Sequence, residues 1–293
     1  MHAAQIRELS SPPELVEIED EAGLRIEAVA LNPVDIAVGN GRFYGGHPPV
    51  PYSPGCEAVG RREDGAHVYL FGDGRGISKS GFLVERVDIP EDECLQLPAD
   101  VDPILAAVTG IAGIAAWIPV AWKAKVTPED RVLVLGATGT VGRIAMQAAR
   151  LLGAAKVVGA SRTAGDGIVG LDEIEEAFDG DGFTVCIDPL WGEPLARALG
   201  AAARHARIVH VGQAAGPEAP LKSADVRGKE LSIFGHSNFA LSKEERDRAH
   251  LELLEHVTAG RITVAYETFA LADLGAAWAW QEAGGKAVVT LGA

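Results

Sequence analysis

Apolar residues recur in two different patterns along the chain, and these patterns divide it into three parts. Up to about residue 106 the apolar runs are short and strand-like, and clusters of Gly and Pro such as GGHPP at 45–49 separate them. From about residue 131 onward, strand-like runs such as VLVLG and KVVGAS alternate with helix-like runs such as VGRIAMQAARLLG. This alternation predicts a parallel, doubly wound sheet.

The third part combines both element types. A charged helix is expected over 243–259 and a second helix over 274–283, with the strand-like runs ITVAYETFAL and KAVVTL on either side of the second helix. His250 and His256 do not share one face of the charged helix, as two metal ligands would. We therefore expect both imidazoles to be solvated.

The most specific local pattern is the stretch RVLVLGATGTVG at 131–142, in which an apolar strand leads through spaced glycines directly into a helix. Such glycines let the chain turn tightly, let a pyrophosphate approach the backbone and let the helix pack closely on its strand. The free N–H groups and the positive dipole end of the helix then face the phosphates. No Gly-Lys-Ser/Thr follows, which excludes a P-loop. The pattern predicts that the following residues bind a dinucleotide: Gly136, Thr138, Gly139, Thr140, Val141 and Gly142.

The end of the next strand-like run indicates which dinucleotide is bound. NAD-binding proteins normally place an acidic residue there to bind the adenosine ribose hydroxyls, whereas this chain has Ser161 and Arg162. A guanidinium and a hydroxyl bind a 2′-phosphate through charge-assisted hydrogen bonds, and a carboxylate would repel it. The sequence therefore favours NADP(H) over NAD(H), with an arginine that merely caps a surface turn as the alternative.

Composition and charge limit the partners. The chain of 293 residues carries a net charge of −15, which disfavours a nucleic-acid partner because its phosphates would be repelled. No apolar run approaches the ~20 residues needed to span a bilayer, and the first residues lack the features of a signal peptide. Cys56, Cys94 and Cys186 are widely spaced and predict neither a disulfide framework nor a Cys-x-x-Cys zinc site. We expect a cytoplasmic protein with no membrane or nucleic-acid partner.

Several motifs, in order over nearly the whole chain, carry a resemblance to a known family. They are LNPVDIAVGNGRFYG from residue 31, VPYSPGCEAVG from 50, GATGTVG from 136, IDPLWG from 187, VGQAAG from 211 and GGKAVVTL from 284. In this combination the chain resembles the medium-chain dehydrogenase/reductase superfamily, and within it the quinone oxidoreductases that lack zinc. The resemblance implies an α/β protein in which a Rossmann domain, residues 108–243, is inserted into a GroES-like, β-rich catalytic domain made of residues 1–107 and 244–293. It also implies a homodimer that pairs through the strand near 230–235.

The resemblance makes zinc the point to check, because zinc alcohol dehydrogenases of the superfamily carry a Gly-His-Glu triplet. Here the triplet reads Gly55, Cys56 and Glu57, and a companion ligand near Pro33 is missing. A tetrahedral catalytic zinc needs three protein ligands. We therefore expect no metal, with Asp35, Cys56 and Glu57 as the one grouping that offers ligand atoms.

Without a Lewis acid, hydride delivery to an electron-poor acceptor is easier than alcohol oxidation. The expected activity is therefore NADPH-dependent reduction of a quinone or an α,β-unsaturated carbonyl. The activity of a zinc-dependent alcohol dehydrogenase is a less favoured alternative to this reduction.

Candidate side chains for this reaction come from the same motifs. Asn32 is the strongest, because the family places an Asn there beside the cofactor, although an Asn before Pro33 is also a turn signal. Tyr44 and Tyr52 are the other catalytic candidates, and Tyr44 can equally pack under its own loop. By the same resemblance, the later motifs supply the remaining cofactor-binding candidates: Gly212, Gln213 and Lys286.

The chain departs from the family between Arg162 and Ile168, where TAGDG stands in place of a helix. A parallel crossover needs about a dozen residues, so we do not expect the segment at Ile168 to form the usual third parallel strand. Because this shortening borders the adenosine side, a second interpretation follows. The chain would then be a catalytically degenerate protein that binds NADP(H) weakly or not at all and serves as a regulatory or structural partner.

Overall fold

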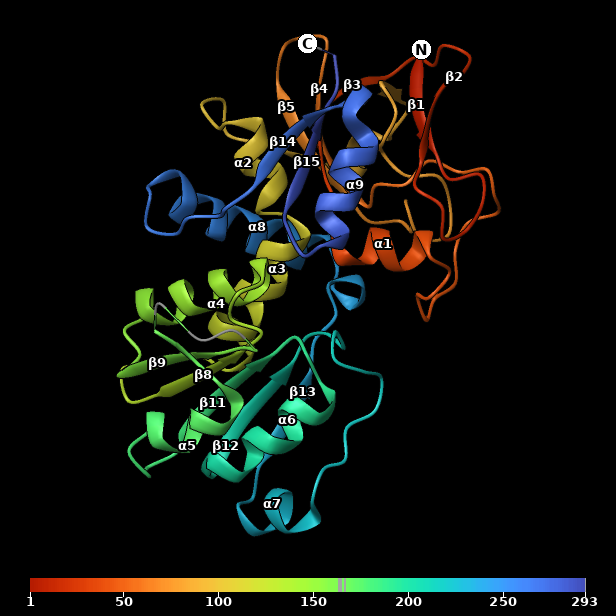
Figure 1. Cartoon of the computed structure of the whole chain (residues 1–293). Coiled ribbons are helices and arrows are strands. Elements are labelled where there is room, and N and C mark those ends of the chain that lie inside the picture. Colours follow the sequence, from red (N-terminus) through yellow and green to blue (C-terminus); the bar gives the residue numbers. More distant parts are fainter. Residues whose placement is uncertain (163–164, 166, 293) are drawn as a thin grey trace. The chain divides into compact units, whose positions relative to one another are not determined.

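A parallel sheet with helices on both faces forms the middle of the chain (Figure 1). The computed structural model describes residues 1–162, 165 and 167–292. Within these residues, six strands lie in the order β10-β9-β8-β11-β12-β13, and neighbouring strands are parallel. This is the strand order 3-2-1-4-5-6 of doubly wound folds that bind dinucleotides. The predicted doubly wound sheet is confirmed.

The chain divides into two units. Unit 1 comprises Met1–Ala112, Ser242–Thr258 and Ala265–Ala293, and unit 2 comprises Gly113–Leu241 and Ala259–Val264. Unit 2 holds the parallel sheet. Its elements are α3 (Ile111–Ile118), the π-helix η2 (Pro119–Lys123), β8 (Arg131–Leu135), α4 (Thr140–Leu151), β9 (Lys156–Ala160), β10 (Ile168–Val169), η3 (Leu171–Glu173), α5 (Ile174–Ala177), β11 (Phe183–Asp188), α6 (Gly192–Ala198), η4 (Leu199–Ala201), β12 (Ala202–His210), α7 (Ser223–Gly228), β13 (Ser232–Gly235) and η5 (Asn238–Ala240).

Alternate residues of the strands face different helices, as the period of a β-strand requires. Leu135, Cys186 and Ile208 belong to one apolar cluster together with buried side chains of α5 and α6. On β9, Gly159 makes room for α4, since a Cβ at that position would lie 2.8 Å from Met146 Sδ. The sheet is therefore covered on both faces, and its carboxyl edge is left for the site.

β10 is short but parallel to β9, with Ile168 opposite Gly159 and Val169 opposite Ala160. The expectation that this segment cannot form a third parallel strand is therefore wrong. Because β10 pairs only with the last residues of β9, the chain returns a short distance and needs no helical crossover. The N–H of Ser161 donates to the carbonyl oxygen of Val169 over 3.0 Å and extends the pairing of β9 with β10 by one hydrogen bond. Part of the connection lies outside the described residues, namely Thr163, Ala164 and Asp166.

Unit 1 contains a largely antiparallel sheet. Within its described residues this is a seven-stranded sheet in the order β14-β15-β3-β4-β5-β7, with β6 paired to β3, while β1 and β2 form a separate pair. Leu274 and Trp278 of α9 pack in the same core as Ile26 and Val29 of β3, so the returning C-terminal segment completes the core of the N-terminal one. The elements are β1 (His2–Gln5), β2 (Glu14–Glu17), β3 (Leu24–Ala30), α1 (Pro33–Gly39), β4 (Glu57–Arg61), β5 (His67–Phe71), β6 (Arg86–Val87), η1 (Glu91–Glu93), β7 (Cys94–Gln96), α2 (Pro103–Val108), α8 (Lys243–Thr258), β14 (Glu267–Ala270), η6 (Leu271–Asp273), α9 (Leu274–Glu282) and β15 (Ala287–Thr290).

The helices of the described chain are too short or too polar to cross a bilayer.

Candidate functional site

The glycine-rich turn joins β8 to α4 at the carboxyl edge of the parallel sheet. Gly136 has φ +60°, a conformation that L side chains rarely adopt. Gly142 lies against the turn itself, because a Cβ there would come within 2.4 Å of the carbonyl oxygen of Gly136. These two positions require glycine for different reasons, one for its backbone angle and the other for close approach. Together they hold the turn tightly over the start of α4.

The start of α4 is open to an anion. The first three N–H groups of a helix, here those of Thr140, Val141 and Gly142, have no acceptor within the helix. Gly139 at the N-cap offers no side chain, and the first turn holds no acidic residue. Free N–H groups at the positive end of a helix dipole bind phosphate well. The geometry therefore suits one phosphate-bearing group of a dinucleotide.

The next strand brings the candidate adenosine contacts to the same edge. Ser161 follows β9 directly and its hydroxyl lies 3.5 Å from the hydroxyl of Thr138 in the glycine-rich turn. Ser161 is 8% exposed, whereas Arg162 beside it is exposed. A buried hydroxyl next to an exposed guanidinium can bind a phosphate from two sides.

The turns after β11 and β12 form the neighbouring part of this edge. Asp188 is fully buried, and its Oδ1 accepts a hydrogen bond of 2.9 Å from the N–H of Leu190. This turn lies against the glycine-rich turn, since a Cβ on Gly136 would lie 3.0 Å from Leu190 Cδ2. Gly212 after β12 adjoins the same turn, because its Cβ would lie 3.0 Å from the carbonyl oxygen of Pro189.

Most of the predicted cofactor-binding positions thus lie at one edge of unit 2. These are Gly136, Thr138, Gly139, Thr140, Val141, Gly142, Ser161, Arg162, Gly212 and Gln213. The remaining one, Lys286, belongs to unit 1, which also contains the catalytic candidates Asn32, Tyr44 and Tyr52.

A buried polar network lies within unit 1, and its hub, Glu57, was not among the predicted site residues. The carboxylate of Glu57, 0% exposed, accepts hydrogen bonds from Asn32 Nδ2 (2.7 Å), the hydroxyl of Tyr69 (2.7 Å) and the N–H of Ile111 (2.6 Å). Lys286 Nζ lies 3.5 Å from the same carboxylate. A charged residue inside an apolar run must find partners when its strand is buried. That signal was present in the runs EAVG and KAVV.

Lys286 and Asn32 are directed into this network. Lys286 is 4% exposed, and its Nζ donates to Asn32 Oδ1 (2.8 Å) and to the carbonyl oxygen of Leu31 (2.9 Å). Since Lys can only donate and Glu57 accepts, the orientation of the Asn32 amide is fixed, and its Nδ2 hydrogens go to Glu57 and to the carbonyl oxygen of Ala30. Burial lowers the pKa of Lys286, while the nearby Glu57 and Asp35 act to raise it.

Asp35, Cys56 and Glu57, the one grouping with possible zinc-ligand atoms, do not fit a zinc site. Asp35 accepts hydrogen bonds from the backbone N–H groups of Asn32, Gly55 and Cys56, and burial raises its pKa to about 6. Burial also raises the pKa of the Cys56 thiol well above its usual value. The carboxylate oxygens of Glu57 already accept hydrogen bonds from Asn32, Tyr69 and Ile111. Over the described chain, no group of three His, Cys, Asp or Glu residues could hold a metal ion.

The two candidate tyrosines differ in their surroundings. Tyr44 is 78% exposed and its ring lies 4.4 Å from that of Phe43. Tyr52 is 2% exposed, and among the described residues its hydroxyl has no hydrogen-bond partner. Burial raises the pKa of Tyr52, so this hydroxyl keeps its proton and can donate.

His250 is fully buried, so the expectation that it is solvated is wrong. Its Nε2 lies 2.9 Å from the carbonyl oxygen of Ala106, and its ring packs edge-on against Tyr69 at 4.1 Å. Most residues of α8 are charged, so the sequence did not indicate its buried face. His250 lies on that face together with Leu253 and Leu254. Burial lowers its pKa to about 4.

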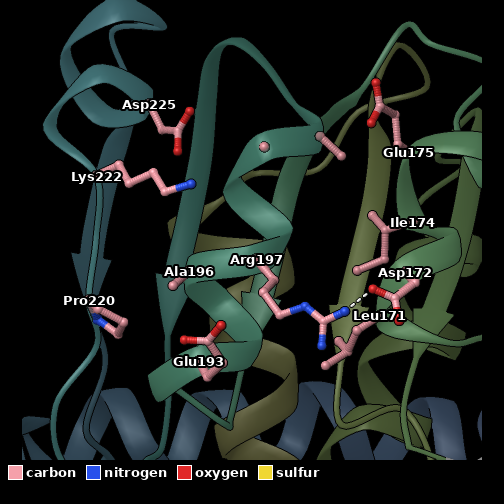
Figure 2. A pocket seen from close by; sticks show the side chains of 12 residues that line it. Leu171, Asp172, Ile174, Glu175, Glu193, Ala196, Arg197, Pro220, Lys222 and Asp225 are labelled. Carbon is pink, nitrogen blue, oxygen red and sulfur yellow. Dashed lines mark hydrogen bonds and ion pairs between the residues drawn. The ribbon is translucent and has the colours of Figure 1, made fainter.

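A separate pocket of about 490 Å³ lies in unit 2 between η3, α5, α6 and the segment leading into α7 (Figure 2). Its charged side chains have both signs, and Arg197 is paired with Asp172 across it. It contains none of the predicted site residues.

Known proteins are similar to the chain over most of its length. No family model matches it. Human quinone oxidoreductase is 29% identical over 243 residues, which are 76% of this chain and 73% of that protein. A quinone oxidoreductase of Thermus thermophilus, solved also in complex with NADPH, superposes with a TM-score of 0.82 and 26% identity over 99% of this chain and 100% of the other. In sequence and in fold the chain is similar to quinone oxidoreductases.

Two further similarities extend this picture. A structure of an NAD-dependent alcohol dehydrogenase has a TM-score of 0.85 at 23% identity over both whole chains, which shows the shared fold. A segment amounting to 14% of a polyketide synthase subunit of Mycobacterium tuberculosis is 28% identical to 93% of this chain. The chain thus has the fold that its motifs predicted.

The Lys286→Met substitution tests the buried network. It leaves the carboxylate of Glu57 buried without its ammonium partner, and breaking a buried pair in this way costs about 3–5 kcal/mol of unfolding free energy. Urea unfolding at neutral pH measures the change. The control is Lys79→Met, which removes a pair with Asp73 whose side chains are 46% and 56% exposed, and costs at most about 1 kcal/mol. Equal, small losses in both variants would contradict the role of the network.

The pH dependence of stability tests the burial of His250. Burial lowers the pKa of His250 in the folded protein below its value in the unfolded chain, so its stabilising contribution is present above about pH 6.5 and is lost as the pH falls towards 4. Asp35 acts in the opposite sense, because its raised pKa costs stability as the pH rises through about 6. The comparison is therefore the wild type against His250→Asn, by urea unfolding at pH 4.5 and 7.5. The variant is expected to lose less stability on acidification, by on the order of 3 kcal/mol, and parallel losses would mean that His250 is accessible to protons in the fold.

Proposed function

We propose that the protein is an NADPH-dependent oxidoreductase that transfers a hydride to a quinone or an α,β-unsaturated carbonyl without a metal. The observation that carries this proposal is that the open start of α4 and the residues Ser161 and Arg162 lie at the same edge of the sheet. Ser161 and Arg162 stand where NAD-binding folds typically have an acidic residue. Relatives named quinone oxidoreductases, one of them solved in complex with NADPH, support the same cofactor and acceptor.

The residues of the chain would bind and orient rather than react. The bound cofactor supplies the hydride, as nicotinamides do in this chemistry. Thr140, Val141 and Gly142 would hold its phosphates through backbone N–H groups, and Ser161 with Arg162 would bind the 2′-phosphate. An electron-poor acceptor needs no Lewis acid, which agrees with the commitment of the Asp35 and Glu57 oxygens to hydrogen bonds. Water would supply the proton.

The catalytic side chains stay predictions. Both hydrogens of the Asn32 amide are used within unit 1, so we assign it the role of holding the buried network of that unit rather than donating to the substrate oxygen. The hydroxyl of Tyr52, which has no partner in the described chain, is the better candidate to donate to a developing oxyanion. Lys286 would act through Asn32, since its ammonium group is engaged there.

A reducing compartment such as the cytoplasm suits this proposal, because the three cysteines are free thiols.

The proposed cofactor choice can be tested by thermal unfolding with NADPH and, separately, NADH. A ligand at 100 times its Kd adds about 2.7 kcal/mol of stability, which for a chain of this size is a rise of roughly 4 °C in Tm. NADPH is expected to give this rise at lower concentration than NADH, and Arg162→Ala is expected to remove the difference. Turnover with a quinone and with an enone then follows for the wild type. No rise with either dinucleotide would favour the catalytically degenerate alternative.

A homodimer through β13 belongs to the proposal. In the described part of the sheet β13 is the outer strand beside β12, and Ile233 and Phe234 on it are 37% and 41% exposed. An uncovered apolar edge strand invites pairing with a second copy.

Light scattering of the full chain at micromolar concentration measures the mass. A dimer is expected, and Phe234→Asp is expected to shift it towards the monomer because a charge would be buried at the edge. Leu251→Asp on α8, at a residue of similar exposure (37%), should leave the dimer intact. A monomeric wild type would remove the proposal of a homodimer.

A further inference from the structure

Positive charge is concentrated in the segment that carries the glycine-rich turn. Residues 131–162 include no Asp or Glu, although the whole chain has 41 acidic and 26 basic residues. The basic residues of this segment are Arg131, Arg143, Arg150, Lys156 and Arg162. A local excess of one sign within an oppositely charged chain indicates a ligand of opposite charge at some of these positions.

Three of the five basic residues lie towards the amino edge of the sheet, where local interactions within the protein account for their positive charge. Arg131 begins β8 and donates to the carbonyl oxygens of Asp181 and Gly182. Lys156 begins β9 and pairs with Asp179 at 2.6 Å. Arg150 lies in the last turn of α4, where a cation complements the helix dipole. Arg143 and Arg162 are left at the carboxyl edge.

Arg143 stands at an unfavourable place for a cation. It lies in the first turns of α4, near the positive end of the helix dipole, and no carboxylate in the first turn balances it. Its side chain is exposed, yet it folds back over the glycine-rich turn, where Nε donates to the carbonyl oxygen of Thr138 over 2.8 Å. Within residues 1–162, 165 and 167–292, its Nη nitrogens have no hydrogen-bond partner. The guanidinium of Arg143 is therefore held by its Nε at the turn that leads to the open N–H groups of Thr140 and Val141. Its two Nη nitrogens are left to bind an anion.

We propose that Arg143 is a cofactor-binding residue whose guanidinium binds the pyrophosphate of the dinucleotide. The proposal rests on the proposed function and adds a second arginine with a different task. Arg162 would bind the 2′-phosphate that NADPH has and NADH lacks, whereas Arg143 would bind the pyrophosphate that both share. Arg143 thus sets the affinity for dinucleotides in general, and Arg162 sets the choice between them.

Dissociation constants of NADPH and NADH, measured by calorimetry on the full chain, test this division. Arg143→Met is expected to weaken both dinucleotides by the same factor, about 10- to 100-fold for the loss of a charge-assisted contact. Arg143→Lys keeps the charge without the fork and should recover part of the loss. Arg162→Ala should weaken NADPH alone. Arg150→Met, at an exposed arginine of the same helix, should weaken neither.

The Tm without cofactor separates binding from folding. Removing a cation near the positive end of α4 should leave this Tm unchanged or slightly raised. A clear fall in the Tm of Arg143→Met would show that the contact with Thr138 is structural and would overturn the proposal. Unchanged affinities would overturn it as well, and a loss for NADPH alone would assign Arg143 to the 2′-phosphate instead. If the wild type binds neither dinucleotide, the proposed function fails together with this inference, whereas normal binding by Arg143→Met removes this inference alone.

Discussion

The buried carboxylate of Glu57 is the constraint on which unit 1 depends. A charge without access to water must be paired and hydrogen-bonded, because its desolvation is otherwise too costly. Glu57 meets this need with donors from separate parts of the chain: Asn32 and Tyr69 before the parallel sheet, Ile111 at the point where the chain leaves for it, and Lys286 after the chain has returned. A unit interrupted by an inserted domain is thus joined at its centre by one carboxylate.

Close approach makes this arrangement possible. A Cβ on Gly110 would lie 1.9 Å from Glu57 Oε2 and 2.3 Å from the hydroxyl of Tyr69, so only glycine lets the backbone of Ile111 reach the carboxylate. The same logic operates in unit 2, where Gly142 lets the start of α4 lie against the turn at Gly136. In both units a missing side chain brings backbone N–H groups to an anion. In unit 1 the anion is Glu57 of the chain itself, and in unit 2 the proposed anion is a ligand.

The sequence predicted most of the architecture because the main patterns are local. The alternation of strand-like and helix-like runs from residue 131 predicted the doubly wound sheet, with β8, α4 and β9 in the right order. The prediction failed at β10, because the rule about crossover length assumes that the returning strand runs the whole length of its neighbour, and β10 pairs with only the end of β9. It also failed at His250, because the polar composition of α8 hides the inner face on which this residue lies.

What the sequence by itself determined is therefore the doubly wound sheet, the glycine-rich turn and the polar residues that follow β9, since each depends on neighbours close along the chain. Only the tertiary structure decided what the charged and polar residues of unit 1 contact. Asn32, Glu57 and Lys286 are far apart in sequence, and whether their polar atoms face a ligand or one another depends on which strands pair, which no local pattern reveals. Burial then requires these three side chains to satisfy one another, because removal from water makes an unpaired polar or charged group costly.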